Sequence, residues 1–328
     1  MLRRTLLASA LAIGVGALTA AAATTPAAAA YPKRPITLVV AWDAGGGTDA
    51  LARMFAAGLE KELGQPVSVV NRTGGGGVVG HTAVANAAPD GYTLGVGSME
   101  ITLYDALGLA LLSADSFTPI MRLAAIPGSL TVAADSEYQT AEDLLQAIKE
   151  SEPRSLKASG CGVGCAWHLA LGGWLDREGL DPNHVQWVPS QGGAPALQDV
   201  IAGGLDLTTA SAVESRSLRE AGKVRTLAVM NEERQDAFPE IPTLKEALGT
   251  DWATGTWFAL IGPNDLPDDL VADLSEAAQS VFESDEFQGF MAERGYVPIG
   301  TGPEETATFM DEFGAGMAGL IDELGIAK

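Results

Sequence analysis

The chain has 328 residues, of which 20 are basic and 42 acidic, so its formal net charge is −22 at neutral pH. Nucleic acids and anionic lipid surfaces attract positive charge, so this balance argues against both as partners. It does not exclude a small anionic ligand, because backbone dipoles hold an anion even where the overall field is unfavourable.

The first thirty residues have the pattern of an export signal. Arg3 and Arg4 form a positive amino-terminal region, an apolar stretch covers 5–20, and small residues at 28–30 form a cleavage site. The apolar stretch is too short and too rich in alanine for a membrane span. The sequence therefore predicts an exported, periplasmic protein without direct membrane insertion, cleaved after about Ala30, and leaves Sec and twin-arginine export as open alternatives.

Short apolar runs alternate with helical patterns after this signal. The run at 35–42 is rich in β-branched residues and predicts a buried strand. Apolar residues with helical spacing over 48–63 predict a helix that ends at Gly64. Further strands are expected at 66–71 and 91–98, with a glycine-started helix between them.

The same alternation restarts near residue 129. Strands are predicted at 129–135, 155–160, 185–190, 205–211, 224–230 and 254–263, with helices between them, the first capped by Thr140. This rhythm is typical of α/β proteins with two units, and we expect the chain to pass between the units more than once. A cleft between two such lobes is the usual place for a small ligand.

Three glycine-rich turns follow predicted strands, at 42–50, 159–168 and 190–197. Each places free backbone N–H groups at the start of a helix, where partial positive charge accumulates. Two of these turns, one from each lobe, are therefore candidates to hold the ends of a small anion. The alternative is that the glycines only make tight turns.

The two cysteines, Cys161 and Cys165, are four residues apart, and a disulfide between them is left open. His168 follows three residues later, so a Cys–His nucleophile or a zinc site needs weighing against a structural role or a ligand contact. The other histidines, His81 and His184, lie in unrelated segments. We therefore predict no metal site and no cofactor. Catalytic motifs such as G-x-S-x-G and H-E-x-x-H are also missing, so we predict that the protein is not an enzyme.

Several segments together closely resemble a known family. YPKRPITLVVAWDAGGGTDALAR, NRTGGGGVVGHTAVANAAPDGYTL, SGCGVGCAWHLA and VPSQGGAPALQDVIAGGLDL are similar to the periplasmic solute-binding proteins of tripartite tricarboxylate transporters, the TctC or Bug family. The resemblance implies a two-lobed periplasmic-binding-protein fold, each lobe a mainly parallel sheet flanked by helices. Lobe 1 is expected to comprise 31–132 and 241–328, and lobe 2 to comprise 133–240.

The resemblance also implies a function. Such a receptor, expected to be a monomer, closes on a small organic anion and delivers it to a membrane complex of one large and one small subunit. Family members hold a carboxylate with backbone and hydroxyl groups from two loops. The ligand-binding residues implied are Trp42, Asp43, Gly45, Gly46, Gly47, Thr48 and Asp49 in the first loop, Ser159, Gly160, Cys161, Gly162, Gly164, Cys165 and His168 in the second, and Gly192, Gly193, Ala194, Ser98, Met99 and Ser211 around them.

Two features depart from the family pattern. Cys161 and Cys165 stand where small hydroxyl residues or glycine are common. Asp43 places a carboxylate near the anion site, where it repels an anion unless it turns to solvent or meets a positive ligand group such as an amine. Two other functions stay open as alternatives: an exported Cys–His enzyme and a receptor that presents its ligand to a sensor kinase.

Overall fold

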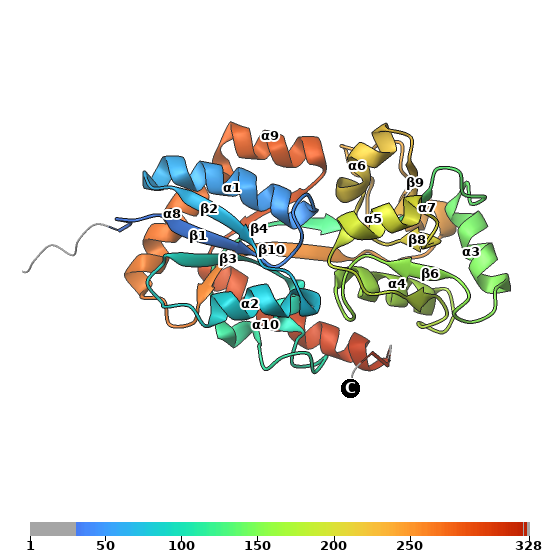
Figure 1. Cartoon of the computed structure of the whole chain (residues 1–328), viewed down its shortest axis with the longest axis horizontal. Helices are drawn as coiled ribbons and strands as arrows, with labels where there is room; N and C mark the ends of the chain where they lie inside the picture. The colour runs from blue at the N-terminus through green and yellow to red at the C-terminus, as the bar shows by residue number, and fades with distance from the viewer. Residues whose placement is uncertain (1–30, 324, 327–328) are drawn as a thin grey trace, which may run out of the picture. The chain divides into compact units, whose positions relative to one another are not determined.

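The computed structural model describes residues 31–323, 325 and 326, and the predicted export signal at 1–30 lies outside them. This part of the chain forms two separate β-sheets, each flanked by helices (Figure 1). None of its helices is both long enough and apolar enough to cross a lipid bilayer.

The first sheet has six strands, which come from both the amino-terminal and the carboxyl-terminal parts of the described chain. Their order is β11 (Val297–Thr301), β4 (Phe117–Pro127), β10 (Gly255–Pro263), β3 (Thr93–Ser98), β1 (Ile36–Val40) and β2 (Val67–Asn71). β1 pairs in parallel with β2 and β3, whereas β10 runs antiparallel to β3 and β4. The three parallel strands all end toward the candidate site, as expected for the carboxyl edge of an α/β sheet.

The second sheet has five short strands. Their order is β7 (Gln186–Trp187), β6 (Lys157–Ser159), β8 (Leu207–Thr208), β5 (Ser129–Ala133) and β9 (Val224–Val229). β6 is parallel to β7 and β8, and β5 is antiparallel to β8 and β9. The predicted α/β class with two sheets is confirmed, and each sheet is mixed, with its parallel strands gathered on one side.

Helices cover both faces of each sheet. On the first sheet, α1 (Gly47–Leu63) and α9 (Asp285–Arg294) lie on one face, and α2 (Val78–Ala85) and α10 (Pro303–Glu323) lie on the other (Figure 1). α8 (Asp268–Glu283) packs against α1 and β4. The second sheet carries α3 (Ala141–Glu150), α4 (Ala166–Arg177), α5 (Gly193–Ile201), α6 (Ala212–Glu220) and α7 (Leu244–Leu248). Three short 3₁₀ helices belong to the first lobe: η1 (Gly75–Gly77), η2 (Met99–Thr102) and η3 (Ala114–Ser116).

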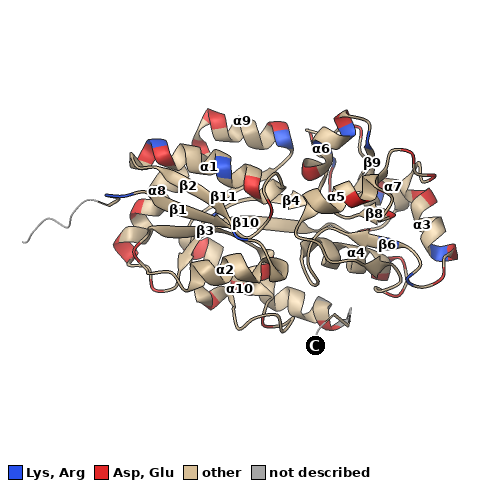
Figure 2. Ribbon diagram, in the orientation of Figure 1, with Lys and Arg blue, Asp and Glu red and all other residues tan. Residues whose placement is uncertain are grey.

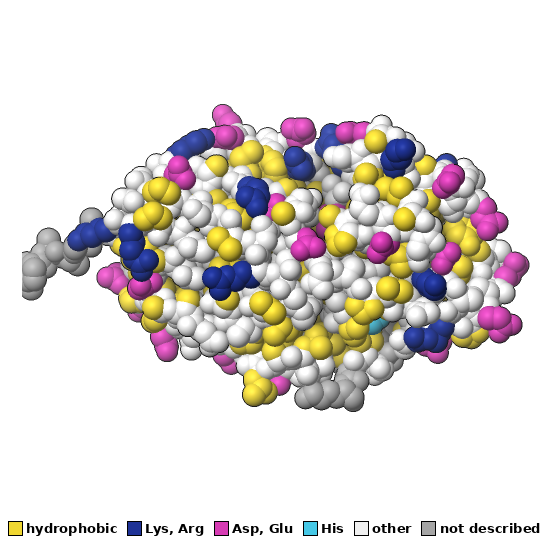
Figure 3. Space-filling model, in the orientation of Figure 1, with side chains coloured by type: hydrophobic (Ala, Val, Ile, Leu, Met, Phe, Trp, Pro, Cys, Tyr) yellow, Lys and Arg dark blue, Asp and Glu magenta, His cyan; other side chains and the backbone are white. Residues whose placement is uncertain are grey.

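Acidic and basic residues are spread over the helices and loops of both lobes (Figure 2). On the face shown in Figure 3, basic side chains stand singly or in small groups among acidic ones. This distribution agrees with the sequence-based argument against a polyanionic partner.

The chain passes between the sheets in two places that lie side by side. Gly128 joins β4 to β5, and the return path from β9 to β10 includes Met230 and Thr254. Backbone hydrogen bonds tie the paths together: Gly128 N–H donates to the Thr254 carbonyl at 2.9 Å, and Met230 N–H donates to the Gly128 carbonyl at 2.8 Å. The predicted double crossing is therefore present, and it is built from few residues.

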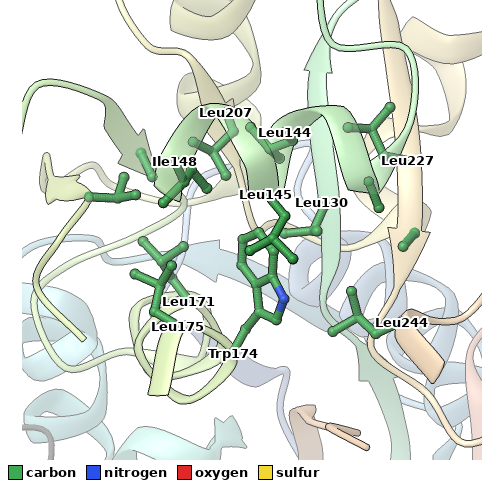
Figure 4. Close-up of a cluster of buried hydrophobic side chains, with 14 of the residues drawn as sticks. Leu130, Leu144, Leu145, Ile148, Leu171, Trp174, Leu175, Leu207, Leu227 and Leu244 are labelled. Atoms are coloured by element: carbon green, nitrogen blue, oxygen red, sulfur yellow. The ribbon is translucent and has the colours of Figure 1, made fainter. Parts of the chain in front are cut away.

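The core of the second sheet helps to locate the lobe boundary. Trp174, Leu144 and Ile148 are fully buried in it, and Leu244 joins them (Figure 4). Trp252 packs against the same cluster. We therefore propose that lobe 2 runs from about residue 129, where β5 begins, to about residue 253, although our sequence-based prediction placed it at 133–240. The cap at the start of α3 is as predicted, because the Thr140 side chain accepts a hydrogen bond from Asp143 N–H.

Two glycines in helices of the first lobe provide a test of this packing. A side chain at Gly58 of α1 would overlap a methyl group of Val281 on α8, whereas Gly289 of α9 has open space around it. Gly58→Ala should lower the free energy of unfolding by roughly 1–3 kcal/mol, because overpacking outweighs the gain in helix propensity. Gly289→Ala should raise it by roughly 0.5–1 kcal/mol. Urea denaturation measures both changes, and effects of the same sign would contradict the packing described.

Candidate functional site

A small cavity lies between the two sheets, where β1, β3 and β6 end. Its free volume is about 30 Å³, room for roughly two water molecules. The residues that line it come from both lobes: Trp42, Asp43, Gly46, Gly47, Thr48, Ser98, Glu100, Ile126, Cys161, Ala166, Trp167, Gly192, Gly193, Ala194, Glu214, Thr256 and Phe258. The cavity is therefore nearly filled by the protein's own side chains.

Three helices begin at this cavity. α1 starts at Gly47, α4 at Ala166 and α5 at Gly193, and each of these first residues is part of the lining. No side chain at the N-cap position of any of the three accepts a hydrogen bond from the helix. Backbone N–H groups at these helix starts therefore need partners from elsewhere, and each start carries partial positive charge.

Glu100, from η2 of the first lobe, supplies a partner for α4 in the second. Its Oε1 accepts a hydrogen bond from Ala166 N–H at 3.0 Å, and its Oε2 accepts one from the Ser98 hydroxyl at 2.6 Å. Ser98 in turn accepts a hydrogen bond from Trp42 Nε1–H at 3.2 Å. Burial raises the pKa of Glu100, and these hydrogen bonds oppose that rise. Both of these hydrogen bonds are donated to the Glu100 carboxyl, an arrangement that an ionised carboxylate can accept.

Glu214, from α6 of the second lobe, makes the reciprocal contact with the first. Its carboxylate accepts hydrogen bonds from Ser211 N–H at 3.1 Å and from the Ser211 hydroxyl at 3.0 Å. Burial raises the pKa of Glu214, and hydrogen bonds from Ser211 and from the Gly47 backbone oppose the rise. Glu214 as a whole residue is only partly buried, so it is its carboxyl end that lies deep in the boundary between the two lobes, here called the seam.

Glycine at the start of α5 makes room for this carboxylate. A side chain at Gly193 would lie 2.7 Å from the Glu214 carboxyl carbon. Tyr296 closes the other side, since its hydroxyl donates to the Gly47 carbonyl at 2.7 Å. The Glu214 carboxylate therefore sits between the starts of α1 and α5.

Asp49 holds the first loop in shape and does not line the cavity. Its carboxylate accepts hydrogen bonds from Gly45 N–H, from Asn71 Nδ2–H and from two nitrogens of Arg53, at 2.9–3.0 Å. Burial favours the neutral acid, but these donors outweigh it and lower the pKa of Asp49. These hydrogen bonds therefore fix the shape of the loop that carries residues 46–48, although Asp49 itself does not line the cavity.

The second loop is also braced. Cys161 and Cys165 form a disulfide with their Cα atoms 6.1 Å apart. His168 accepts a hydrogen bond from Gly164 N–H at 3.0 Å and stacks on Trp187, with ring centroids 4.6 Å apart. Burial lowers the pKa of His168 to about 4, so the ring is neutral at pH 7. His168 therefore has a structural environment, away from the cavity lining.

The structure brings half of the predicted ligand-binding residues into the lining. These are Trp42, Asp43, Gly46, Gly47, Thr48, Ser98, Cys161, Gly192, Gly193 and Ala194. The other ten lie close by but outside it: Gly45, Asp49, Met99, Ser159, Gly160, Gly162, Gly164, Cys165, His168 and Ser211. Because no ligand is present, the contacts of both groups with a ligand stay a prediction.

Seven lining residues were not predicted: Glu100, Ile126, Ala166, Trp167, Glu214, Thr256 and Phe258. A sequence signal existed for one of them. Ser211 and Glu214 have the S-x-x-E spacing of a capping box, which marks the start of a helix, and both halves of that box form. Ile126, Thr256 and Phe258 reach the cavity through the pairing of β4 and β10 with β3, for which the sequence gives no local signal. Ala166 and Trp167 lie inside the predicted turn at 159–168, and Glu100 follows the predicted strand at 91–98 by two residues.

Comparison with solved structures identifies the class of protein. The periplasmic binding protein BugD superposes with a TM-score of 0.84 and 27% identity, and the match covers 91% of this chain and 100% of that one. Two lobes with helix starts facing a shared cavity are the arrangement of a periplasmic binding protein.

The family follows from the sequence comparison. A model described as "Tripartite tricarboxylate transporter family receptor" (TctC) matches residues 51–326, so the chain belongs to this family of binding proteins and is not an enzyme. A protein from Pseudomonas sp. strain P51, named "UPF0065 protein in tcbD-tcbE intergenic region", is 32% identical over 281 residues, which are 85% of this chain and 82% of that one.

Two further structures of relatives contain ligands. Rpa4515 of R. palustris, solved with adipate, has a TM-score of 0.85 and 30% identity, and the match covers 91% of this chain and 99% of that one. MatC of Rhodopseudomonas palustris, solved with malate, has a TM-score of 0.82 and 27% identity, with 89% and 100% covered. Relatives of this fold thus bind small dicarboxylates.

The role assigned to Asp49 can be tested by substitution. Asp49→Asn removes the charge that Arg53 and the loop N–H groups share, and should lower the free energy of unfolding at pH 7 by roughly 1–3 kcal/mol. Asp251→Asn is the matched control, because its ion pair with Lys245 is exposed and should contribute less than about 1 kcal/mol.

The pH dependence gives the same test a second readout. Because the pKa of Asp49 is lowered in the folded state, its stabilising effect is complete above the ordinary aspartate pKa and is lost as the pH falls below it. The difference between wild type and Asp49→Asn in urea denaturation should therefore shrink as the pH is lowered below about 4. A difference that stays constant with pH would contradict the ionised role.

Proposed function

We propose that this protein is a periplasmic receptor that captures a small carboxylate in the cavity between its lobes and delivers it to a tripartite tricarboxylate transporter. One observation carries the proposal: three helices without N-cap side-chain bonds begin at the same cavity. Helix starts bind carboxylates through their free N–H groups and their partial positive charge.

A hydroxyl group adds to this donor set. Thr48 lines the cavity and is almost fully buried, whereas the proton of the neighbouring Ser98 hydroxyl is already donated to Glu100. A carboxylate that reaches Thr48 lies next to the first turn of α1, where an anion is favoured. The ligands of the two relatives, adipate and malate, are of this chemical class.

Entry of such a ligand requires the lobes to separate. The free volume of about 30 Å³ holds roughly two waters, which is much less than a dicarboxylate needs. The backbone pairing of Gly128 with Met230 and Thr254 is the natural hinge, since both crossings of the chain pass through it. We propose that the structure is a closed form and that opening bends the chain at these residues.

The partners in this proposal are the membrane subunits of the transporter, and the receptor acts as a monomer. Membership of the TctC family supports this output. Uptake of a labelled ligand by cells that lack this chain, with and without its reintroduction, tests transport directly. Unchanged uptake together with a lost transcriptional response to the ligand would support presentation to a sensor kinase instead.

Calorimetry on the purified protein tests the binding step. At least one of a panel of small mono-, di- and amino-carboxylates, with malate and adipate included, should bind and raise the unfolding temperature by mass action. Thr48→Val should weaken that ligand by about fivefold, as expected for the loss of one hydrogen bond. Thr308→Val, on exposed helix α10, is the matched control and should leave the affinity unchanged. No binding across the panel by a folded sample would refute the proposal.

A further inference from the structure

The charges that line the cavity are all of one sign. Asp43, Glu100 and Glu214 line it, and no described lining residue is Lys, Arg or His. We propose that Glu100 and Glu214 determine the ligand class of this cavity, and that the carboxylate it binds also carries a cationic nitrogen. The inference rests on the proposed receptor function and specifies its substrate class.

The first argument concerns the helix donors that a ligand carboxylate would use. Glu100 already occupies the start of α4, where it accepts the Ala166 N–H at 3.0 Å. The Glu214 carboxylate accepts a hydrogen bond from the Gly47 backbone at the start of α1, and it lies close to Gly193 at the start of α5. A dicarboxylate placed across the cavity would bring a like charge to each glutamate, which is the usual way a site rejects a wrong ligand.

The second argument concerns the hydrogen-bond donors of the cavity that the two glutamates leave unused. Thr48 and Ala194 line the cavity beside the two helix starts of the first and third glycine turns. Once the lobes have separated, one ligand carboxylate would accept hydrogen bonds there from the Thr48 hydroxyl and from the backbone N–H groups that Glu214 leaves free. The two carboxylates of Glu100 and Glu214 have the opposite preference. They favour a ligand group that carries positive charge and has N–H or N–CH₃ bonds.

Aromatic walls strengthen this assignment. Trp42, Trp167 and Phe258 line the same cavity, and each is at most 9% exposed. Aromatic faces combined with carboxylates, in a site without basic side chains, are the composition that recognises an organic cation. A metal ion is a poorer fit, since no three His, Cys, Asp or Glu side chains in the described chain are arranged to hold one.

Ligands that differ only in one terminal group test the inference. Adipate and 6-aminohexanoate have similar length, as do succinate and 4-aminobutyrate, and in each pair a –CH₂NH₃⁺ group replaces one carboxylate. We expect calorimetry at pH 7 to show that at least one amino acid binds wild type more than about tenfold tighter than its paired dicarboxylate, as expected for a desolvated charge pair with aromatic contact.

Substitution of the glutamates assigns the preference to them. Glu100→Gln and Glu214→Gln keep the side-chain shape and should each reduce the preference for the amino acid to less than about threefold. Glu246→Gln is the matched control: Glu246 is also the third residue of a helix with a capping box, but it lies outside the cavity lining. It should retain the wild-type preference.

The outcomes separate this inference from the receptor function. Tighter binding of the dicarboxylate of each pair by wild type would overturn the inference and leave the receptor proposal intact. A preference for the amino acids that survives in both glutamine variants would overturn the assignment to Glu100 and Glu214. Absence of binding by any carboxylate, in a sample that unfolds cooperatively, would overturn both. The wild-type comparison alone decides the ligand class if a variant fails to fold.

Discussion

The unsatisfied N–H groups at the starts of α1, α4 and α5 are the constraint on which the closed structure depends. Each helix begins where a strand of its own lobe ends, and each lacks a side-chain cap. For α1 and α4 the partner comes from the facing lobe: Glu100 reaches Ala166 of α4, and Glu214 reaches Gly47 of α1. Binding of an anion by a helix start and closure of the two lobes are thus the same kind of interaction.

This arrangement explains why buried carboxylates are tolerated in the seam. An ionised carboxylate loses much hydration on burial, which is why burial raises the pKa values of Glu100 and Glu214. Hydrogen bonds from backbone N–H groups and from Ser98 and Ser211 offset that loss. The seam is therefore stable only while the donors face the glutamates, and separating the lobes exposes both at once.

Local patterns in the sequence predicted the elements that each segment forms by itself. The β-branched run at 35–42 became β1, the helical spacing at 48–63 became α1, and Thr140 capped α3. β4 was missed, because its buried residues do not alternate along Phe117–Pro127. Its position between β10 and β11 decides its structure. Glu100 was missed for the same reason: its partner, Ala166, is 66 residues away, and no local signal reports a contact between lobes.

The two loops of the site are held more firmly than the two glutamates, and under the proposed function this difference places the ligand specificity at the glutamates. Asp49 fixes the first loop through four donors, and the Cys161–Cys165 disulfide braces the second. These loops offer backbone N–H groups, and no substitution of a side chain removes them. They therefore suit the carboxylate, which is the feature that many ligands share. Glu100 and Glu214 are side chains that reach across the seam, and a single substitution changes their charge without disturbing either loop. Under the proposed function, the ligand class would therefore change through these two positions while the carboxylate-binding loops stay the same.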